Sequence, residues 1–378
     1  MTMNRDNKSA LKTLTEALQD PHRAAQKDRE KGFPIFGYLT EYVPLELIYA
    51  ADILPIRVQG GSISTLASEH LQTFSCSYCR TVIHEAMKGE YDYLDGLISA
   101  KTCDVALPLF QVWTFRKSLK FNWLLSLPGN KDEAAVLYFR EELSHFRKAL
   151  ETFRKVTISD QKIEKTTLLY NEYRALVNQI WQKRNDGSLG LTGREVIGAL
   201  KGSQLLPPED SLNLLKDLVK NGEGKDVSSR KGIPLILLGN VFFDLTLIEM
   251  IEKSGGQIMV DDTAATGRHF DGPVVLQGDP LTSLARYYTA KISGDYRLAY
   301  EDHLEHVLQL IRKWNIKASI LLLQKFCDSS FFASSLFVQS LKDHGIPSLV
   351  LEIDDTSPAL GPMETRIQAF LEMVGGIV

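Results

Sequence analysis

Four cysteines are the residues whose chemistry stands out in this chain of 378 residues: Cys76, Cys79, Cys103 and Cys327. Cys103 and Cys327 each end an apolar run and precede an aspartate, in DGLISAKTCD (95–104) and ASILLLQKFCD (318–328). If each run is a strand of a parallel sheet, both thiols lie outside a carboxyl strand end, where ligands bind in open α/β sheets. The two thiols could then face each other across a cleft, and Cys76 would add a third.

Several roles are open to such thiols. A cysteine at the end of a strand is often only a small buried hydrophobe. The single pair Cys76-x-x-Cys79 does not make a paired CxxC zinc site, and it lacks the turn typical of a thioredoxin-like redox site. A structural zinc ion held by Cys76, Cys103 and Cys327 would need a fourth ligand.

Other catalytic motifs are absent from the sequence. It contains no GxxxxGK[ST] phosphate loop, no GxGxxG dinucleotide fingerprint, no GxSxG elbow and no HExxH pair. His303 and His306 fall in a charged helical segment and are predicted to lie on its solvated face. The four cysteine thiols are therefore the main indication in the sequence of a catalytic or cofactor-binding site.

The composition limits the class of protein. A formal net charge of −4, with 44% hydrophobic and 24% charged residues, is typical of a globular protein and argues against nucleic-acid binding as the main function. Apolar runs such as ILLL (320–323) are too short to span a membrane. The polar start predicts no signal peptide, and we expect a cytoplasmic protein with free thiols.

The elements that must position the thiols alternate between strand and helix in both halves of the chain. The predicted strands are 33–39, 53–61, 94–104, 233–240, 257–262, 317–328 and 346–355. Between the halves, long helical patterns are followed by a linker rich in Gly, Ser and charge. The pattern predicts an α/β protein with two similar doubly wound parallel-sheet domains joined by a helical region. We place a first domain with an N-terminal helix at 1–132, the helical region at 133–228 and a second domain at 229–378.

The sequence resembles the family of 2-hydroxyacyl-CoA dehydratase and benzoyl-CoA reductase subunits, known from the 2-hydroxyglutaryl-CoA dehydratase D-component. The matching segments span nearly the whole chain, and their order and separation are specific to the family: GYLTEYVPLELIYAADILPIRVQGG (37–61), LQTFSCSYCR (71–80), GEYDYLDGLISAKTCD (89–104), VDDTAATGR (260–268), DPLTSLARYY (279–288), KFCD (325–328), GIPSLVLEID (345–354) and TRIQAFLEMV (365–374).

The resemblance implies one [4Fe–4S] cluster per chain, held by Cys76, Cys103 and Cys327. Thiolates suit such clusters, and three protein ligands leave one iron open. Cys79 falls where the family has no ligand, so it is interpreted as an extra thiol. Asp104 and Asp328 would either orient the surroundings of the cluster or cap the following helices.

Further site residues follow from the same resemblance. Glu46, in the family's P-x-E segment, is predicted as an acid or base, or else as a first-turn carboxylate that complements the helix dipole. Thr40 would line the pocket, and Gly60 and Gly61 would allow a ligand to approach the backbone. Arg268, and similarly Arg366, would bind a CoA phosphate or form a structural ion pair.

The implied reaction begins with the transfer of a low-potential electron to a CoA thioester, which gives a ketyl-type radical anion in an oxygen-sensitive enzyme of anaerobic metabolism. The segments CSYCR and GEYDYLDG favour a benzoyl-CoA reductase-type subunit. The alternatives are a 2-hydroxyacyl-CoA dehydratase subunit, which eliminates water to an enoyl-CoA, and a non-catalytic electron-transfer subunit. The implied partners are an acyl-CoA or aromatic-CoA substrate, a homologous second subunit and an ATP-dependent iron–sulfur activator.

One position departs from the family pattern. Where the family usually has Ala-Ala-Gly before the second strand, this chain has Ala50-Ala51-Asp52. We expect the aspartate to alter the edge of the pocket and therefore to affect the choice of substrate.

Overall fold

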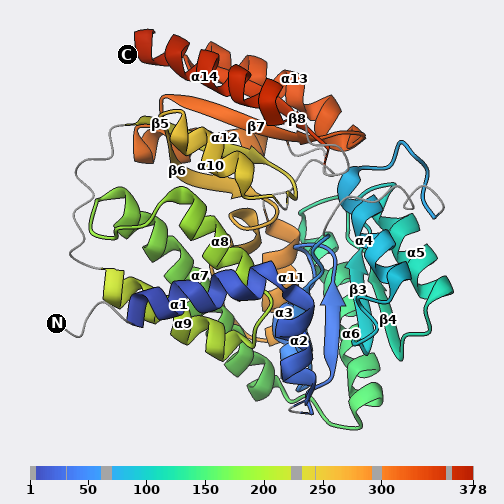
Figure 1. Ribbon diagram of the computed structural model, residues 1–378. Helices are drawn as coiled ribbons and strands as arrows, with labels where there is room; N and C mark the ends of the chain where they lie inside the picture. The colour runs from blue at the N-terminus through green and yellow to red at the C-terminus, as the bar shows by residue number, and fades with distance from the viewer. Residues whose placement is uncertain are drawn as a thin grey trace.

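Two parallel sheets, each with helices packed beside it, and a further group of helices make up the chain in the computed structural model (Figure 1). The structure describes residues 6–30, 32–60, 70–222, 232–242, 244–291, 300–354 and 360–377. One four-stranded sheet lies in the first half of the chain and the other in the second half.

The first sheet has the strand order β2-β1-β3-β4, and every neighbouring pair is parallel. Its strands are β1 (Ile35–Tyr38), β2 (Leu54–Arg57), β3 (Gly96–Ala100) and β4 (Phe121–Leu125). Its helices are α3 (Leu45–Ala50), α4 (Ser77–Lys88) and α5 (Ala106–Arg116). β1, β2 and β3 are buried along their whole length, as expected for parallel strands covered on both faces.

The second sheet repeats this order as β6-β5-β7-β8, again all parallel. Its strands are β5 (Ile233–Gly239), β6 (Gly256–Thr263), β7 (Ala318–Gln324) and β8 (Ser348–Ile353). The helices of this half are α10 (Thr246–Lys253), the 3-10 turn η2 (Arg268–Phe270), α11 (Pro280–Ala290), α12 (Tyr300–Trp314), α13 (Asp328–Asp343) and α14 (Leu360–Ile377). β2 and β6 therefore occupy equivalent edge positions in the two sheets.

The middle of the chain is helical, as its periodicity predicts. It contains α6 (Glu133–Arg154), α7 (Asp160–Asn185), α8 (Gly193–Ser203) and α9 (Pro208–Gly222). Local sequence starts these helices: Asp132 and Ser159 accept backbone N–H groups at the starts of α6 and α7, and Thr192 and Glu195 form a capping box at α8.

The N-terminal helical segment divides into α1 (Asp6–Gln19) and α2 (Pro21–Glu30), with proline as the first residue of α2. α1 packs on α8 and α9. The contact is close at Gly202, where an added Cβ would lie 1.9 Å from the carbonyl oxygen of Leu14. The helix at the start of the chain thus joins the helical middle region.

One segment of the second half packs on the first. α11 packs against α6 and α7, and its side chains Leu281, Leu284 and Tyr288 share one hydrophobic core with β1 and α3. Figure 1 shows α11 among the helices between the sheets. The two halves are therefore interlocked by packing as well as by the chain connection.

The predicted α/β class, with two parallel sheets and a helical middle region, is confirmed. β4 and α5 were not predicted from the sequence, although the β4 segment FNWLL (121–125) is mostly apolar; β4 is a partly buried edge strand. The domain boundaries at 132 and 228 stay predictions, and residue 228 lies outside the described residues. Among the helices that the structure describes, none combines the length and apolar character needed to cross a membrane.

The expectation for Asp52 was wrong. Asp52 precedes β2, at the end of the strand opposite to the cysteines, and its carboxylate pairs with Lys162 at 2.6 Å. Its φ of 55° is in the left-handed region, which explains why glycine suits this position. The departure from the family therefore concerns a turn and an exposed ion pair, not the edge of the cysteine pocket.

Candidate functional site

Cys76, Cys103 and Cys327 line one cavity of about 110 Å³, together with the buried Cys79. Cys76 and Cys327 are the residues immediately before α4 and α13, and Cys103 lies three residues before α5. The positive end of a helix dipole favours a thiolate over a thiol. Carboxyl ends of strands in both sheets thus bring the three thiols to one place, as the positions of Cys103 and Cys327 predicted.

Burial disfavours the thiolate form of Cys103 and Cys327. It raises the pKa of Cys103 to about 11 and raises the pKa of Cys327, where Cys76 adds to the effect. The hydrogen bond with Cys76, followed by burial, raises the pKa of Cys79 well above its usual value. A metal centre here would therefore displace protons as it binds.

Polar contacts between the two halves of the chain hold the cavity together. The Ser77 hydroxyl, in the first turn of α4, donates to the Gln324 side chain at the end of β7. Gln324 in turn donates to the carbonyl oxygen of Val241 at 2.7 Å. Farther along α4, Arg80 pairs with Asp354 at 3.3 Å. These bonds fix the first-half thiols relative to Cys327.

The cysteines fit an iron–sulfur group in donor type, and they line one cavity. Thiolate sulfur is the ligand that such clusters prefer. Across the described ranges, no three His, Cys, Asp or Glu side chains already stand in a metal-binding arrangement, so the thiols surround a cavity without meeting at one point. The number of ligands and the identity of the group therefore stay predictions.

Among the other polar residues that line the same cavity are Thr40, Glu41 and Arg57. Arg57 is the last residue of β2 and only 4% exposed, yet neither of its terminal nitrogens has a hydrogen-bond partner among the described residues. The buried Thr40 hydroxyl also has none within that part of the chain. Arg57 lies near the Tyr38 ring, 5.5 Å from its centroid. The cavity thus combines thiols with hydrogen-bond donors that the fold leaves unused.

Glu46 is not among the residues that line this cavity. It is fully buried, its carboxylate pairs with Arg174, and it accepts a hydrogen bond from the Tyr288 hydroxyl at 2.8 Å. The carboxylate that lines the cavity is that of Glu41, five residues earlier. A catalytic role of Glu46 stays a prediction, and its observed contacts tie α3 to α7 and α11.

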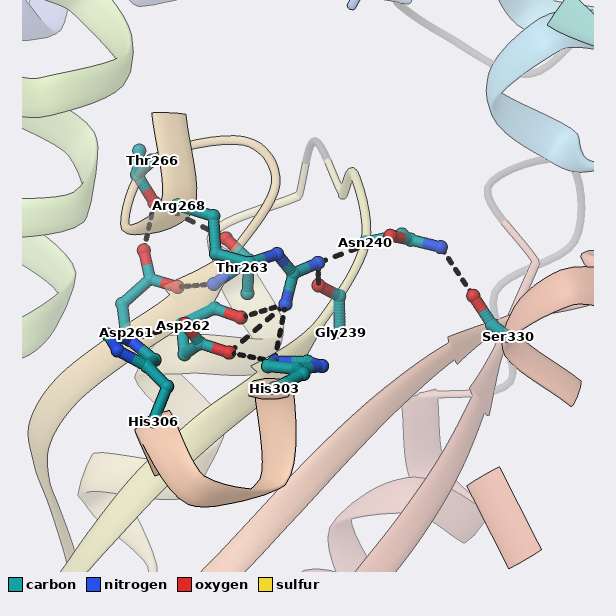
Figure 2. Close-up of polar contacts among 10 residues, drawn as sticks. All are labelled: Gly239, Asn240, Asp261, Asp262, Thr263, Thr266, Arg268, His303, His306 and Ser330. Atoms are coloured by element: carbon teal, nitrogen blue, oxygen red, sulfur yellow. Dashed lines mark hydrogen bonds and ion pairs between the residues drawn. The ribbon is translucent and has the colours of Figure 1, made fainter. Parts of the chain in front are cut away.

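Arg268 lies at the centre of a buried ion-pair network at the carboxyl end of the second sheet (Figure 2). Its guanidinium donates to the carboxylate of Asp262 at 3.1 Å and to the backbone oxygens of Asp262 and Gly239, each at 2.7 Å. Burial opposes ionisation of Asp262, but the charges of Arg268 and His303 outweigh burial and hold its pKa well below the usual value. Of the two roles predicted for Arg268, the structure contains the ion pair.

The prediction that His303 and His306 are solvated was wrong. Nε2 of His303 lies 2.6 Å from one oxygen of Asp262, and Nε2 of His306 lies 3.5 Å from the other. Burial by itself lowers the pKa of His306, but the hydrogen bond to Asp262 raises it above the usual value. The helical pattern of α12 did not reveal these contacts, because their partner lies about 40 residues earlier in the chain.

The network reaches the cysteine cavity through Asn240. Arg268 donates to the Asn240 side-chain oxygen at 3.3 Å, and the Asn240 amide donates to Ser330 and, at 3.6 Å, to the sulfur of Cys327. Figure 2 shows this chain of contacts from Asp262 to Ser330. The orientation of Asn240 beside Cys327 is therefore set by Arg268.

The other predicted site residues lie elsewhere. Gly60 is buried just after β2 but does not line the cysteine cavity, and Gly61 lies outside the described residues. Asp104 and Asp328 are exposed. Arg366 donates to the carbonyl oxygen of Val350 at 2.8 Å.

Sequence reasoning missed Arg57, Glu41, Asn240 and Gln324 as cavity residues. Arg57 and Gln324 are the last residues of β2 and β7, and Asn240 directly follows β5. The rule that ligands bind at carboxyl strand ends could have identified these three. Glu41 follows β1 by three residues and carried no comparable signal.

Comparisons with known proteins identify the family of the chain. The family model described as 2-hydroxyglutaryl-CoA dehydratase, D-component, matches residues 40–374. The chain is 23% identical over 357 residues to a subunit of the benzoyl-CoA reductase of Thauera aromatica, covering 92% of each chain. It is 25% identical to the lactoyl-CoA dehydratase subunit beta of Anaerotignum propionicum, covering 96% of this chain and 98% of the relative. It is 24% identical to the (R)-2-hydroxyglutaryl-CoA dehydratase, subunit beta, of Acidaminococcus fermentans, covering 96% and 99%.

The match begins two residues after β1, continues through the rest of the first sheet, the helical middle region and the second sheet, and spans the positions of all four cysteines. Each of these three relatives is named as a subunit of a larger enzyme, which implies other subunits. The chain belongs to the 2-hydroxyglutaryl-CoA dehydratase D-component family, which includes subunits of acyl-CoA dehydratases and of a benzoyl-CoA reductase.

Proposed function

We propose that this chain is the [4Fe–4S]-carrying subunit of an oxygen-sensitive acyl-CoA reductase of the benzoyl-CoA type. One observation carries the proposal: Cys76, Cys103 and Cys327, from both halves of the chain, line a single cavity. When bound, the cluster would supply a low-potential electron to a CoA thioester. The proposed partners are a homologous second subunit and an ATP-dependent iron–sulfur protein that delivers electrons.

In this proposal, the chain itself holds the cluster, positions its surroundings and excludes water. The three thiolates hold the cluster, and Cys79 stays an extra thiol. Leu39, Leu109 and Ala264 line the cavity with apolar surface, which strengthens electrostatic interactions inside it. The Glu41 carboxyl group is the acid in the cavity and therefore the group that we propose to hold a proton for the reaction.

The first test is anaerobic reconstitution with iron and sulfide, followed by quantification of both per chain. We expect about four iron atoms per chain in the wild type, lost in Cys76→Ser, Cys103→Ser and Cys327→Ser. Cys79→Ser is the matched control, because this thiol lines the same cavity and should be dispensable. A wild type without iron, or a cluster that survives loss of Cys103 or Cys327, would contradict the proposal.

Dehydration is the second candidate, because the relatives from Anaerotignum propionicum and Acidaminococcus fermentans are named dehydratase subunits. The two reactions differ in their products: reduction yields a dearomatised ring from benzoyl-CoA, whereas dehydration yields an enoyl-CoA from a 2-hydroxyacyl-CoA. The loaded chain, combined with its second subunit and electron donor, should be offered benzoyl-CoA and lactoyl-CoA in parallel. Turnover of lactoyl-CoA alone would replace the reductase proposal with the dehydratase.

A further inference from the structure

Arg57 is a buried cation for which the described part of the chain provides no counterion. It is 4% exposed, and neither of its terminal nitrogens has a hydrogen-bond partner among the described residues, the Glu41 carboxylate of the same cavity included. Burying an ionised group without a partner costs several kcal/mol, so such groups are normally paired or bind a ligand. The position of Arg57 at the end of β2 places this charge in the wall of the cysteine cavity.

A second unused donor lines the same cavity. The Thr40 hydroxyl is buried without a hydrogen-bond partner in the described chain, although buried hydroxyl groups are usually bonded. Two unused donors in one cavity define a site for an acceptor that carries negative charge. A guanidinium group can donate two parallel hydrogen bonds to oxygen, which favours an oxygen ligand.

We infer that Arg57 and Thr40 form an oxygen-binding site that recognises the acyl oxygen of a CoA thioester beside the cysteines. The inference rests on the proposed function for the class of substrate, and it adds the residues that recognise the acyl group. The thioester oxygen already carries partial negative charge and gains more when the thioester accepts an electron. Fixed donors are most effective where charge develops in this way.

The test compares two ligands that differ only in this oxygen. Benzoyl-CoA has the thioester carbonyl, whereas the thioether S-benzyl-CoA has a methylene group in its place. Their dissociation constants would be measured anaerobically by calorimetry on the full, iron-loaded chain. A parallel pair, lactoyl-CoA and S-(2-hydroxypropyl)-CoA, covers the dehydratase alternative.

We expect Arg57→Met to raise the dissociation constant of the thioester about 10- to 100-fold and to leave that of the thioether unchanged, as expected for loss of a charge-assisted hydrogen bond. Arg57→Lys should retain part of the discrimination, since the charge remains. Thr40→Val should have a smaller effect in the same direction. Thr167→Val is the matched control, because the Thr167 hydroxyl is equally buried and unpartnered but does not line this cavity.

Three outcomes would overturn the inference: equal losses for thioester and thioether, no loss for either, or no binding of any CoA compound by the wild type. The midpoint potential of the cluster, from a redox titration followed by electron paramagnetic resonance, adds a separate criterion. If Arg57→Met shifts this potential but leaves both dissociation constants unchanged, Arg57 balances the charge of the thiolate-bound cluster, and the proposal of an oxygen-binding site is wrong. Iron per chain, measured in the same samples, shows separately whether the proposed cluster is present. If Arg57→Met does not fold, the same dissociation constants are compared for Arg57→Lys and Thr40→Val.

Discussion

Arg57 and Arg268 are two buried arginines at equivalent edges of the two sheets, and their surroundings are opposite. Arg57 ends β2, and Arg268 follows β6 by five residues. Arg268 donates to a carboxylate, to two backbone carbonyl oxygens and to Asn240. The terminal nitrogens of Arg57 have no partner within the described residues. The fold balances the charge of Arg268 internally and provides no counterion for Arg57 among the described residues.

This difference distinguishes Arg268, which stabilises the fold through its ion pair, from Arg57, which we propose to bind a ligand. A cation whose carboxylate partner comes from the fold contributes to holding its own surroundings together, and removing it leaves that carboxylate buried and unpaired. A cation without a partner makes the ligand-free fold less stable and gains its partner on binding. The predictions for Arg268 and Arg57 below test this distinction, and a third concerns Asp261, the buried carboxyl group beside the Asp262 partner of Arg268. They run from the largest expected effect to the smallest.

Arg268→Met should destabilise the chain by about 3–5 kcal/mol, because the buried Asp262 loses the cation that holds it ionised. The measurement is the free energy of unfolding in urea at neutral pH. Arg184→Met is a suitable control, since Arg184 pairs at 3.4 Å with the more exposed Glu252; its loss should cost less. A loss below about 1 kcal/mol for Arg268→Met would contradict the structural role of Arg268.

The neighbouring Asp261 should make stability depend on pH. Burial raises the pKa of Asp261 to about 7, from a usual value of 3.8. The native state therefore keeps a proton that the unfolded chain releases. The stabilisation by this proton is complete below about pH 4 and is lost as the pH rises to about 7, by roughly 2–4 kcal/mol.

Asp261→Asn should abolish this component of the pH dependence, because the amide cannot ionise and its oxygen can still accept the Thr263 N–H group, which lies 2.8 Å from the aspartate oxygen. Unfolding free energies of the wild type and the variant, measured from pH 4 to pH 8, provide the comparison. Parallel curves for the two proteins would show that Asp261 is ionised in the native state across this range.

Arg57→Met should have the smallest effect on the ligand-free chain: no change in unfolding free energy, or a gain of up to about 1 kcal/mol, because an unpaired buried charge is removed. The measurement is the same urea titration used for Arg268→Met. A loss of more than about 2 kcal/mol would mean that Arg57 stabilises the fold, and the contrast between the two arginines would disappear.

The sequence revealed much of the architecture, because the relevant signals are local. Period-2 and period-3.6 patterns and the helix start at Thr192 act over a few residues. The break at Pro21 is equally local but was not predicted, because the N-terminal segment was expected to form one helix. β4 was not predicted although four of its five residues are apolar, because so short an apolar run does not by itself distinguish a strand from a buried helix segment. The helix α12 was predicted, but the contacts of His303 with Asp262 were not.

The sequence by itself determined the two strand–Cys–Asp segments, the α/β alternation in each half and, by resemblance, the family. Only the tertiary structure decided that α11 packs on the first half, that Cys76, Cys103 and Cys327 line one cavity, and which arginine has a counterion. The physical reason is the distance along the chain over which each interaction acts. Backbone conformation and capping respond to neighbours in the chain, whereas the partner of a buried charge or thiol is chosen by packing between segments that lie tens to hundreds of residues apart.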